Sequence, residues 1–329
     1  MQHFRTTLTK LNFDFDINHK DQILCVGSCF AENIAQKLQR NKFSTLLNPF
    51  GILYNPVSIE KALSMLLENY KFSEKELFEN QGLWHSFHHH GHFSNPDKMK
   101  TLQTINNELS RGQAFLKTAN RLIVTLGTAN VFVYKKSGEI VANCHKLPGS
   151  EFDRKRLSVE VVTEKLSQIF NNLKIQNPDL QIITTVSPIR HIRDGLVENQ
   201  KSKAILLLAL DKICTNLDFV HYFPSYEILL DDLRDYRFYE ADLIHPNTVA
   251  IDYIWDIFKQ SFFEKETNDL NVGIEKIVVA SQHRPFHVES AQHQSFLKQQ
   301  IGKIEKLTEK YPHLNLKEEI NLFEKQLLK

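Results

Sequence analysis

Short apolar runs alternate with amphipathic stretches along most of the chain. The runs at 22–27, 120–130 and 179–188 are typical of buried strands. Apolar residues recur every three or four positions at 30–38 and 196–215, which predicts helices. The same criteria predict strands at 43–51 and 217–225, a hairpin at 131–144, helices at 57–70 and 157–173, and a loop running into a helix at 242–258. This alternation predicts a doubly wound, mainly parallel α/β sheet.

The composition narrows the classes of function. The chain has 329 residues, of which 42% are hydrophobic, so it can bury a large core. A formal net charge of +1 argues against a nucleic-acid partner bound by bulk electrostatics. No stretch approaches the roughly 20 apolar residues of a membrane helix, and the N-terminal residues lack an apolar signal region. We therefore expect a cytoplasmic protein without membrane contact. The oligomeric state stays open.

The four cysteines are widely spaced and form no C-x-x-C pair, which disfavours a zinc site or a redox pair. Reduced thiols are expected, and neither a metal nor another cofactor is expected. From about residue 264 the composition shifts to Lys, Glu, Gln and His, with helical periodicity at 295–311 and 316–328. The predicted domains are therefore an α/β domain at 1–263 and a helical extension at 264–329.

The stretch ILCVGSCFAENIAQKL begins as a strand, turns at Gly27 and continues as a helix. Two residues with nucleophilic side chains, Ser28 and Cys29, occupy the turn. The first N–H groups of a helix favour a thiolate or an oxyanion, and a cysteine there can have a lowered pKa. A structural alternative stays open, in which Ser28 caps the helix and Cys29 packs in the core.

A second motif, DLIHPN, precedes the last helix of the predicted sheet. Asp242 and His245 lie three positions apart, so in a tight turn the carboxylate can orient the imidazole. The imidazole can then activate a nucleophile from another strand end. Alone this spacing is weak, since many solvated loops contain Asp and His.

Together the two motifs have the order found in the Ser-Gly-Asn-His hydrolases, the GDSL-like esterases. The first motif spells the five letters after which the GSCFA family is named, and the sequence resembles that family over about 13–263. The segments that carry the resemblance are GSCFAENIA, NPFGILYNP, LGTANVF, NCHKLPG, SPIRHIRDG and DLIHPN. The resemblance implies the three-layer α/β sandwich of the Ser-Gly-Asn-His hydrolases more firmly than it implies a reaction.

The resemblance also implies roles for the two motifs. In the pattern Gly-Asp-Ser the nucleophile follows Gly by two positions, which puts Ser28 where Asp is expected and Cys29 at the nucleophile. Shifting the register by one makes Ser28 the nucleophile instead. We favour Cys29 and keep Ser28 as the alternative. Asp242 and His245 match the Asp-x-x-His-Pro element of the hydrolases.

The oxyanion-binding elements match less well. Gly51, after the second predicted strand, fits the location of the glycine that donates an N–H. The third element, Gly-x-Asn-Asp, corresponds to Gly127 onwards, but here Ala129 occupies the Asn position. The amide of Asn130 or the hydroxyl of Thr128 is expected to substitute, because losing one oxyanion donor costs about 10²–10³ in rate.

Three more side chains are candidates for substrate binding. Arg190 and His191 follow a predicted strand in SPIRHIRDG, and His145 lies in NCHKLPG. An arginine fork suits a carboxylate or phosphate group. A cluster of histidines at 85–92 contains pairs with the i,i+4 spacing of a helical metal site. Gly91 interrupts that cluster and no nearby acid or cysteine completes a ligand set, so a loop beside the active site or in solvent is preferred.

The expected function is hydrolysis of an ester, an acyl or acetyl group on a small-molecule or carbohydrate-like substrate, through a Cys/Ser-His-Asp site. One alternative is an O-acyltransferase that uses the same site, because excluding water favours transfer over hydrolysis. A binding protein on a hydrolase-like scaffold is the other alternative, since a fold does not fix a function.

Overall fold

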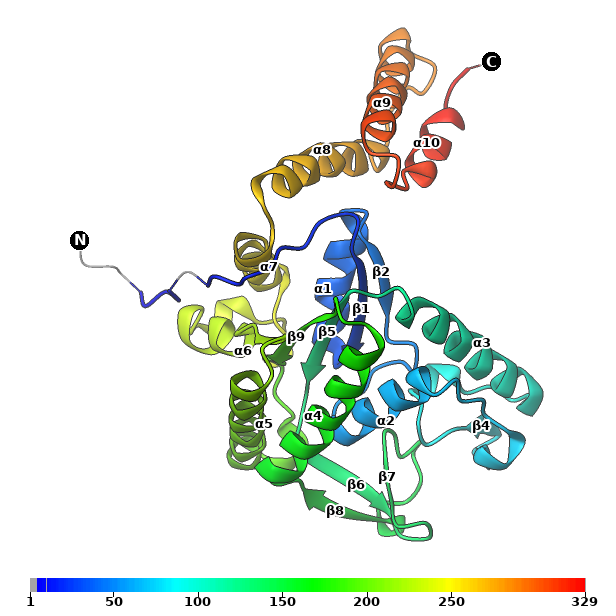
Figure 1. Cartoon of the computed structure of the whole chain (residues 1–329). Helices are drawn as coiled ribbons and strands as arrows, with labels where there is room; N and C mark the ends of the chain where they lie inside the picture. Colours follow the sequence, from blue (N-terminus) through cyan, green and yellow to red (C-terminus); the bar gives the residue numbers. More distant parts are fainter. Residues whose placement is uncertain (1–4, 10, 329) are drawn as a thin grey trace. The chain divides into compact units, whose positions relative to one another are not determined.

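A five-stranded sheet in the order β10–β9–β5–β1–β2 forms the centre of the α/β part (Figure 1). The computed structural model describes residues 5–9 and 11–328. β1 pairs with β5, β5 with β9, and β9 with β10, and all three pairs are parallel. The mainly parallel α/β sheet predicted from the sequence is therefore confirmed. The five strands are β1 (Gln22–Gly27), β2 (Ser44–Leu47), β5 (Arg121–Leu126), β9 (Gln181–Val186) and β10 (Val220–Tyr222).

The helices fall close to the predicted stretches. A capping residue starts several of them: the Asn55 side chain accepts from the Ser58 N–H, and Pro56 follows at the first helical position. The helices of this part are α1 (Cys29–Arg40), α2 (Pro56–Leu67), α3 (Lys98–Leu116), α4 (Val159–Gln176), α5 (Leu196–Asn216), the short α6 (Ser225–Glu227) and α7 (Thr248–Phe262).

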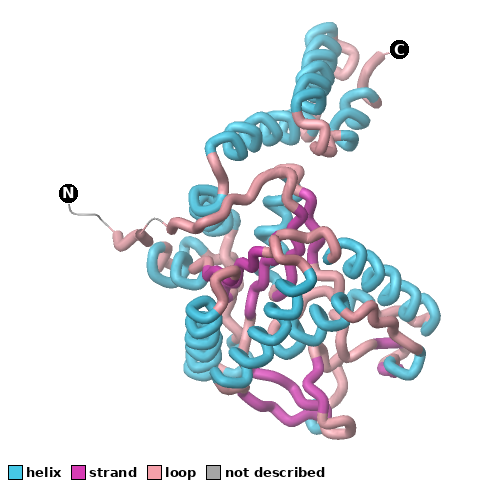
Figure 2. The backbone as a smooth tube through the Cα atoms, in the orientation of Figure 1, coloured by secondary structure: helices cyan, strands magenta, loops and turns pink. Residues whose placement is uncertain are grey.

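One large hydrophobic core joins α2, α3, α4 and α5 to one face of the sheet. Leu24 and Val26 of β1 and Leu122 and Val124 of β5 supply the strand side of this core. These positions alternate along each strand, as they must when side chains point to opposite faces. α2 and α4 cross in front of the sheet in Figure 1, and the tube in Figure 2 shows them over the strands.

The order of the strands fixes where a ligand would bind. From β1 the chain first moves outward to β2 and then returns to β5 on the other side of β1. The carboxyl ends of β1 and β5 therefore form the topological switch point, the crevice where doubly wound sheets bind their ligands. The Gly27–Cys29 turn follows β1, and the turn that begins at Gly127 follows β5.

Two smaller sheets flank the central one. The predicted hairpin at 131–144 is confirmed as β6 and β7. A third strand that the sequence pattern did not predict, β8, pairs antiparallel with β6. Four of the five residues of β8 are exposed, so no apolar alternation marks it. The strands are β6 (Asn130–Tyr134), β7 (Glu139–Val141) and β8 (Phe152–Arg156), and β3 (Phe78–Asn80) pairs with β4 (Leu83–His85).

The chain divides into two units. The first contains 5–9, 22–35 and 45–256, and the second contains 11–21, 36–44 and 257–328. The helices of the second unit are α8 (Lys265–Ser281), α9 (Ala291–Lys310) and α10 (Lys317–Glu324), whose core includes Ile277, Ile304 and Phe323. The predicted domain boundary between 263 and 264 stays a prediction. Among the described residues, no helix has both the length and the apolar character needed to cross a membrane.

Candidate active site

The turn after β1 lies directly against β5. Gly27 pairs with Thr125, and the Ser28 N–H donates to the Thr125 carbonyl at 3.0 Å. Gly27 has a φ of +140°, and a Cβ at this position would lie 2.2 Å from the Thr125 oxygen. Only glycine fits so close an approach, which explains why the strand ends on it.

The two candidate nucleophiles differ in their surroundings. The side chain of Ser28 is 1% exposed, and its Oγ has no hydrogen-bond partner among the described residues. Cys29 is only partly buried, as the first residue of α1. Burial, followed by the charge of Glu32, raises the pKa of its thiol, whereas the N–H groups of Cys29 and Phe30 act in the opposite direction. The helix start thus offers its N–H groups to the sulfur.

A buried lysine on α5, which the sequence analysis missed, faces the same strand end. Lys203 is 1% exposed, and its Nζ donates to the carbonyls of Gly127 and Ser187, both at 2.7 Å. These carbonyls follow β5 and β9 respectively. The charge of Lys203 lowers the pKa of Cys29, so the ammonium and the thiol act on each other across this crevice.

The segment 48–55 ties the ends of β1 and β5 together. The Asn48 Oδ1 accepts the Gly27 N–H at 2.9 Å, and the Leu53 N–H donates to the Gly27 carbonyl at 3.0 Å. The Tyr54 carbonyl accepts two N–H groups, from Gly127 at 2.8 Å and from the next residue at 3.0 Å. A single segment therefore sets the width of the crevice.

Gly51 lies in a tight turn within that segment. Its N–H donates to the Asn48 carbonyl at 2.7 Å, and its φ is +75°. A Cβ here would approach the His90 Cβ to 2.4 Å. The predicted oxyanion role of Gly51 requires its N–H to leave Asn48.

His191 lies beside the turn after β5. Its ring stands edge-on to Tyr54, with the centroids 5.0 Å apart, and its Nε2 is 3.2 Å from where a Cβ of Gly127 would be. Burial lowers the pKa of His191 to about 4, and the positive charges of Lys203 and of His245 act in the same direction. His191 is therefore neutral near pH 7, and it senses the charge of His245.

The Asp-x-x-His motif forms the expected pair in the loop before α7. The His245 Nδ1 lies 2.6 Å from Asp242 Oδ2, and Asp242 Oδ1 accepts the N–H groups of Ile244 and His245. These bonds, the His245 N–H first among them, lower the pKa of Asp242 to about 2. A carboxylate in this position favours the neutral imidazole tautomer with the proton on Nδ1, which leaves Nε2 as a hydrogen-bond acceptor. Both side chains are about half exposed, at 46% and 49%.

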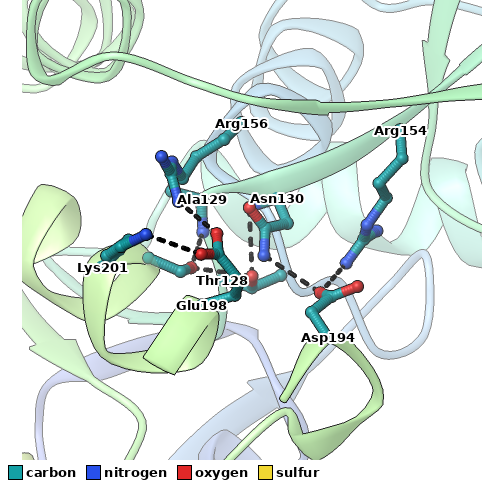
Figure 3. A network of polar contacts seen from close by, with 9 residues as sticks. Thr128, Ala129, Asn130, Arg154, Arg156, Asp194, Glu198 and Lys201 are labelled. Carbon is teal, nitrogen blue, oxygen red and sulfur yellow. Dashed lines mark hydrogen bonds and ion pairs between the residues drawn. The ribbon is translucent and has the colours of Figure 1, made fainter. Parts of the chain in front are cut away.

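The side chains of Thr128 and Asn130 belong to a polar network (Figure 3). The Asn130 Nδ2 donates to Asp194 at 3.0 Å, and Asp194 also binds Arg154. The Thr128 hydroxyl accepts the Asn130 N–H at 3.0 Å and bonds to Ser202 at 2.9 Å. Figure 3 shows Asp194 between Asn130 and Arg154, so both predicted oxyanion groups already have partners.

A cavity of about 480 Å³ adjoins these residues. It brings together four of the predicted site residues, namely Thr128, Asn130, His145 and His191. Arg190 is not part of its lining and instead lies 6.0 Å from the Tyr239 ring centre. The other lining side chains with polar groups are Tyr54, Asn55, Asn143, Cys144, Lys146, Arg154, Arg193 and Asp194.

His145 is buried in the wall of this cavity. Its Nε2 lies 2.7 Å from the Ser86 carbonyl, and burial lowers its pKa to about 4. The preceding histidine cluster forms no α-helix, since β4 ends at His85 and Gly91–Phe93 is a single 3-10 turn. Within 5–9 and 11–328, no three His, Cys, Asp or Glu side chains are grouped to hold a metal ion.

One feature of the sequence indicates that Lys203 is buried. It shares the buried face of α5 with Leu206 and Leu210, three and seven positions further on. A lysine in register with an apolar stripe needs buried acceptors. Those acceptors come from the ends of β5 and β9, which are far away in the sequence.

Comparison with known proteins identifies the family. No curated protein sequence matches the chain. One structural neighbour is a candidate platelet activating factor from Streptococcus pneumonia, with 11% identity, 73% of this chain and 82% of that chain covered, and a TM-score of 0.37. Another is the acetyl xylan esterase Est2A from the rumen bacterium Butyrivibrio proteoclasticus, with 10% identity, 63% and 56% covered, and a TM-score of 0.32.

The sequence models of two families match in separate regions. The GSCFA family matches residues 22–258, and the C-terminal domain of GSCFA domain proteins matches residues 274–329. The first match includes both the Gly27–Cys29 turn and the Asp242–His245 loop. The chain therefore belongs to the GSCFA family.

Proposed function

We propose that this protein hydrolyses an ester, with an acetyl or other short acyl group carried by a carbohydrate-like substrate. The main support is the Asp242–His245 pair, whose 2.6 Å contact prepares the imidazole as a base. A thiol at the N-terminus of α1, at the switch point of the sheet, supplies the partner for that base.

In the proposed reaction, His245 Nε2 takes the thiol proton of Cys29. The thiolate attacks the ester carbonyl carbon and forms a tetrahedral oxyanion. The collapse of this intermediate breaks the C–O bond to the alcohol, which takes the proton back from His245. Water then attacks the thioester with His245 as base, and the acid and the free thiol are released.

Two N–H groups are suited to the oxyanion. Those of Cys29 and Phe30 already act on the sulfur at the start of α1. The amide of Asn130 and the hydroxyl of Thr128 are engaged with Asp194 and Ser202, so either contributes only by exchanging that partner for the substrate oxygen.

The 480 Å³ cavity is the proposed site for the remainder of the substrate. Tyr54 and His191 line it, and both also contact the turn after β5. Amide, imidazole and guanidinium groups dominate its polar lining, and these are the groups that hydrogen-bond sugar hydroxyls. This composition favours a hydroxylated substrate over a purely apolar one.

Hydrolysis of p-nitrophenyl acetate and of acetylated oligosaccharides tests the proposal. Cys29→Ala and His245→Ala are expected to abolish turnover. Ser28→Ala is expected to retain it, because the Ser28 hydroxyl is buried and has no partner among the described residues. Cys214→Ala and His313→Ala serve as controls outside the site. Full activity in both Cys29→Ala and His245→Ala would overturn the mechanism, and loss in Ser28→Ala alone would make Ser28 the nucleophile.

The alternative of a binding protein has one supporting observation, the engagement of Thr128 and Asn130 with other side chains. Failure to hydrolyse any ester, together with retained oligosaccharide binding in Cys29→Ala, would favour it. A stable acyl-enzyme detected by intact mass after incubation with acetyl-coenzyme A would favour an O-acyltransferase.

A further inference from the structure

Three buried polar residues of α5, Asn199, Ser202 and Lys203, hold the loops that border the crevice. The Asn199 Oδ1 accepts the His191 N–H at 2.9 Å, and the Ser202 Oγ accepts the Ala129 N–H at 2.7 Å. Lys203 adds its two bonds to carbonyls, one after β5 and one after β9. All three α5 side chains are at most 2% exposed. This buried face of α5 therefore determines how the loops after β5 and β9 are held.

Hydrogen bonding alone does not account for a lysine at this position. Neutral side chains such as Asn199 and Ser202 hold neighbouring loops by accepting backbone N–H groups, whereas burying an ammonium group is costly unless a negative charge lies near. Within the described part of the chain, no carboxylate is paired with Lys203. Burial lowers its pKa to about 7, and the acidic group that favours its charged form is Cys29.

The backbone explains why the two groups meet. The Ser28 N–H, next to Cys29, binds the Thr125 carbonyl, and Lys203 binds the Gly127 carbonyl two residues further along. The start of α1, where Cys29 lies, and the ammonium group are thus both bound to the same short piece of backbone at the end of β5. The other groups that act on the thiol or the ammonium are Glu32 on α1, His191 after β9, and the rings of Tyr54 and Tyr226.

We propose that Lys203 is a positioning residue of this site, whose ammonium group, fixed by the Gly127 and Ser187 carbonyls, stabilises the thiolate of Cys29. Lys203 transfers no proton in this step: the thiol proton passes to His245 or to water, and the protonated form of Lys203 stabilises the resulting thiolate. This inference extends the proposed function, since it names a group that opposes the effect of burial on the pKa of the Cys29 thiol. The thiol–ammonium coupling itself can be measured without any ester.

Alkylation of the full-length protein by iodoacetamide, followed across a pH series by peptide mass spectrometry, tests the coupling. Only the thiolate reacts, so the profile of Cys29 reports its pKa. Lys203→Met is expected to slow alkylation of Cys29 near neutral pH by about tenfold, which corresponds to a shift of one pKa unit. Lys203→Arg, which keeps the charge, is expected to retain most of the rate.

Cys144 provides an internal control in the same digest. Its thiol senses Arg193 and Arg154, not Lys203, so its alkylation should be equal in all variants. A folded Lys203→Met variant, with the circular dichroism of the parent and an unchanged Cys29 profile, would overturn the proposal. Slower Cys29 alkylation without any ester turnover would instead reject only the proposed function.

A reciprocal measurement avoids any change at Lys203. The ¹³Cε resonance of Lys203 is titrated in the parent protein and in Cys29→Ser, which removes the thiolate. Because coupling is reciprocal, Lys203 should lose its proton at a lower pH in Cys29→Ser than in the parent. Equal midpoints would overturn the proposal even if Lys203→Met fails to fold.

Discussion

The turn at Gly27–Cys29 and the loop at Asp242–His245 carry the two halves of the proposed site and are built in opposite ways. The turn is held by long-range bonds to Thr125, Asn48 and Leu53, and its glycine has no room for a side chain. The loop is held by bonds among residues 237–247, the Asp242–His245 pair itself within three positions, and the two side chains of that pair are half exposed. Substitutions in the turn should therefore lower the free energy of unfolding, whereas substitutions in the loop should lower only the rate of ester hydrolysis.

The largest effect is expected for Gly27→Ala. Backbone strain at a φ of +140° and a 2.2 Å approach to the Thr125 oxygen together should lower the free energy of unfolding by about 4 kcal/mol. Gly82→Ala is the matched control, since Gly82 also has a positive φ but nothing within 4 Å of its Cβ position. It should cost about 1 kcal/mol in urea unfolding. If Gly27→Ala and Gly82→Ala lowered the free energy of unfolding equally, the close approach to β5 would not be the reason that position 27 requires glycine.

A smaller effect, confined to the chemistry, is expected for Asp242→Asn. Losing the charge that orients His245 should lower kcat/KM for p-nitrophenyl acetate by about 10²-fold. The free energy of unfolding should change by less than about 0.5 kcal/mol, because the side chain is on the surface. Asp235→Asn, in the same region and also bonded to a backbone N–H, should leave kcat/KM unchanged. An unaltered kcat/KM in Asp242→Asn would show that the pair does not orient the base.

The last effect, small over any one pH unit, concerns the pH dependence of stability near the turn. Burial lowers the pKa of Lys203 from 10.5 to about 7 in the folded chain, so the unfolded chain binds more protons between these values. Stability should therefore rise with pH across this range, by at most about 1.4 kcal/mol per pH unit. We expect this rise in Cys29→Ser and not in Cys29→Ser/Lys203→Met, compared by urea unfolding. If the free energy of unfolding changed with pH in the same way in the single and the double variant, this prediction would be contradicted.

Features set by local patterns were predictable from the sequence. The strand ending at Gly27, the helix after it and the Asp242–His245 pair depend on periodicity or on a spacing of three residues. The predicted strand at 43–51 was too long. β2 ends at Leu47 because Asn48, with a φ of +43°, turns the chain and binds Gly27.

Features set by distant partners were not predictable. The carbonyls that hold Lys203 follow two strands distant from it in the sequence, β5 and β9, and nothing in the sequence of α5 indicates them. The Asp194 carboxylate that binds Asn130 lies 64 positions away. One sequence gives the residue types of such a network but not their pairing, because the pairing arises only when the sheet forms.

The segment 48–55 supports both sides of the crevice. Its bonds reach Gly27 on one side, and Gly127 and Thr128 on the other. Both strand ends are therefore anchored to one short segment, and local unfolding of that segment would release both ends at once.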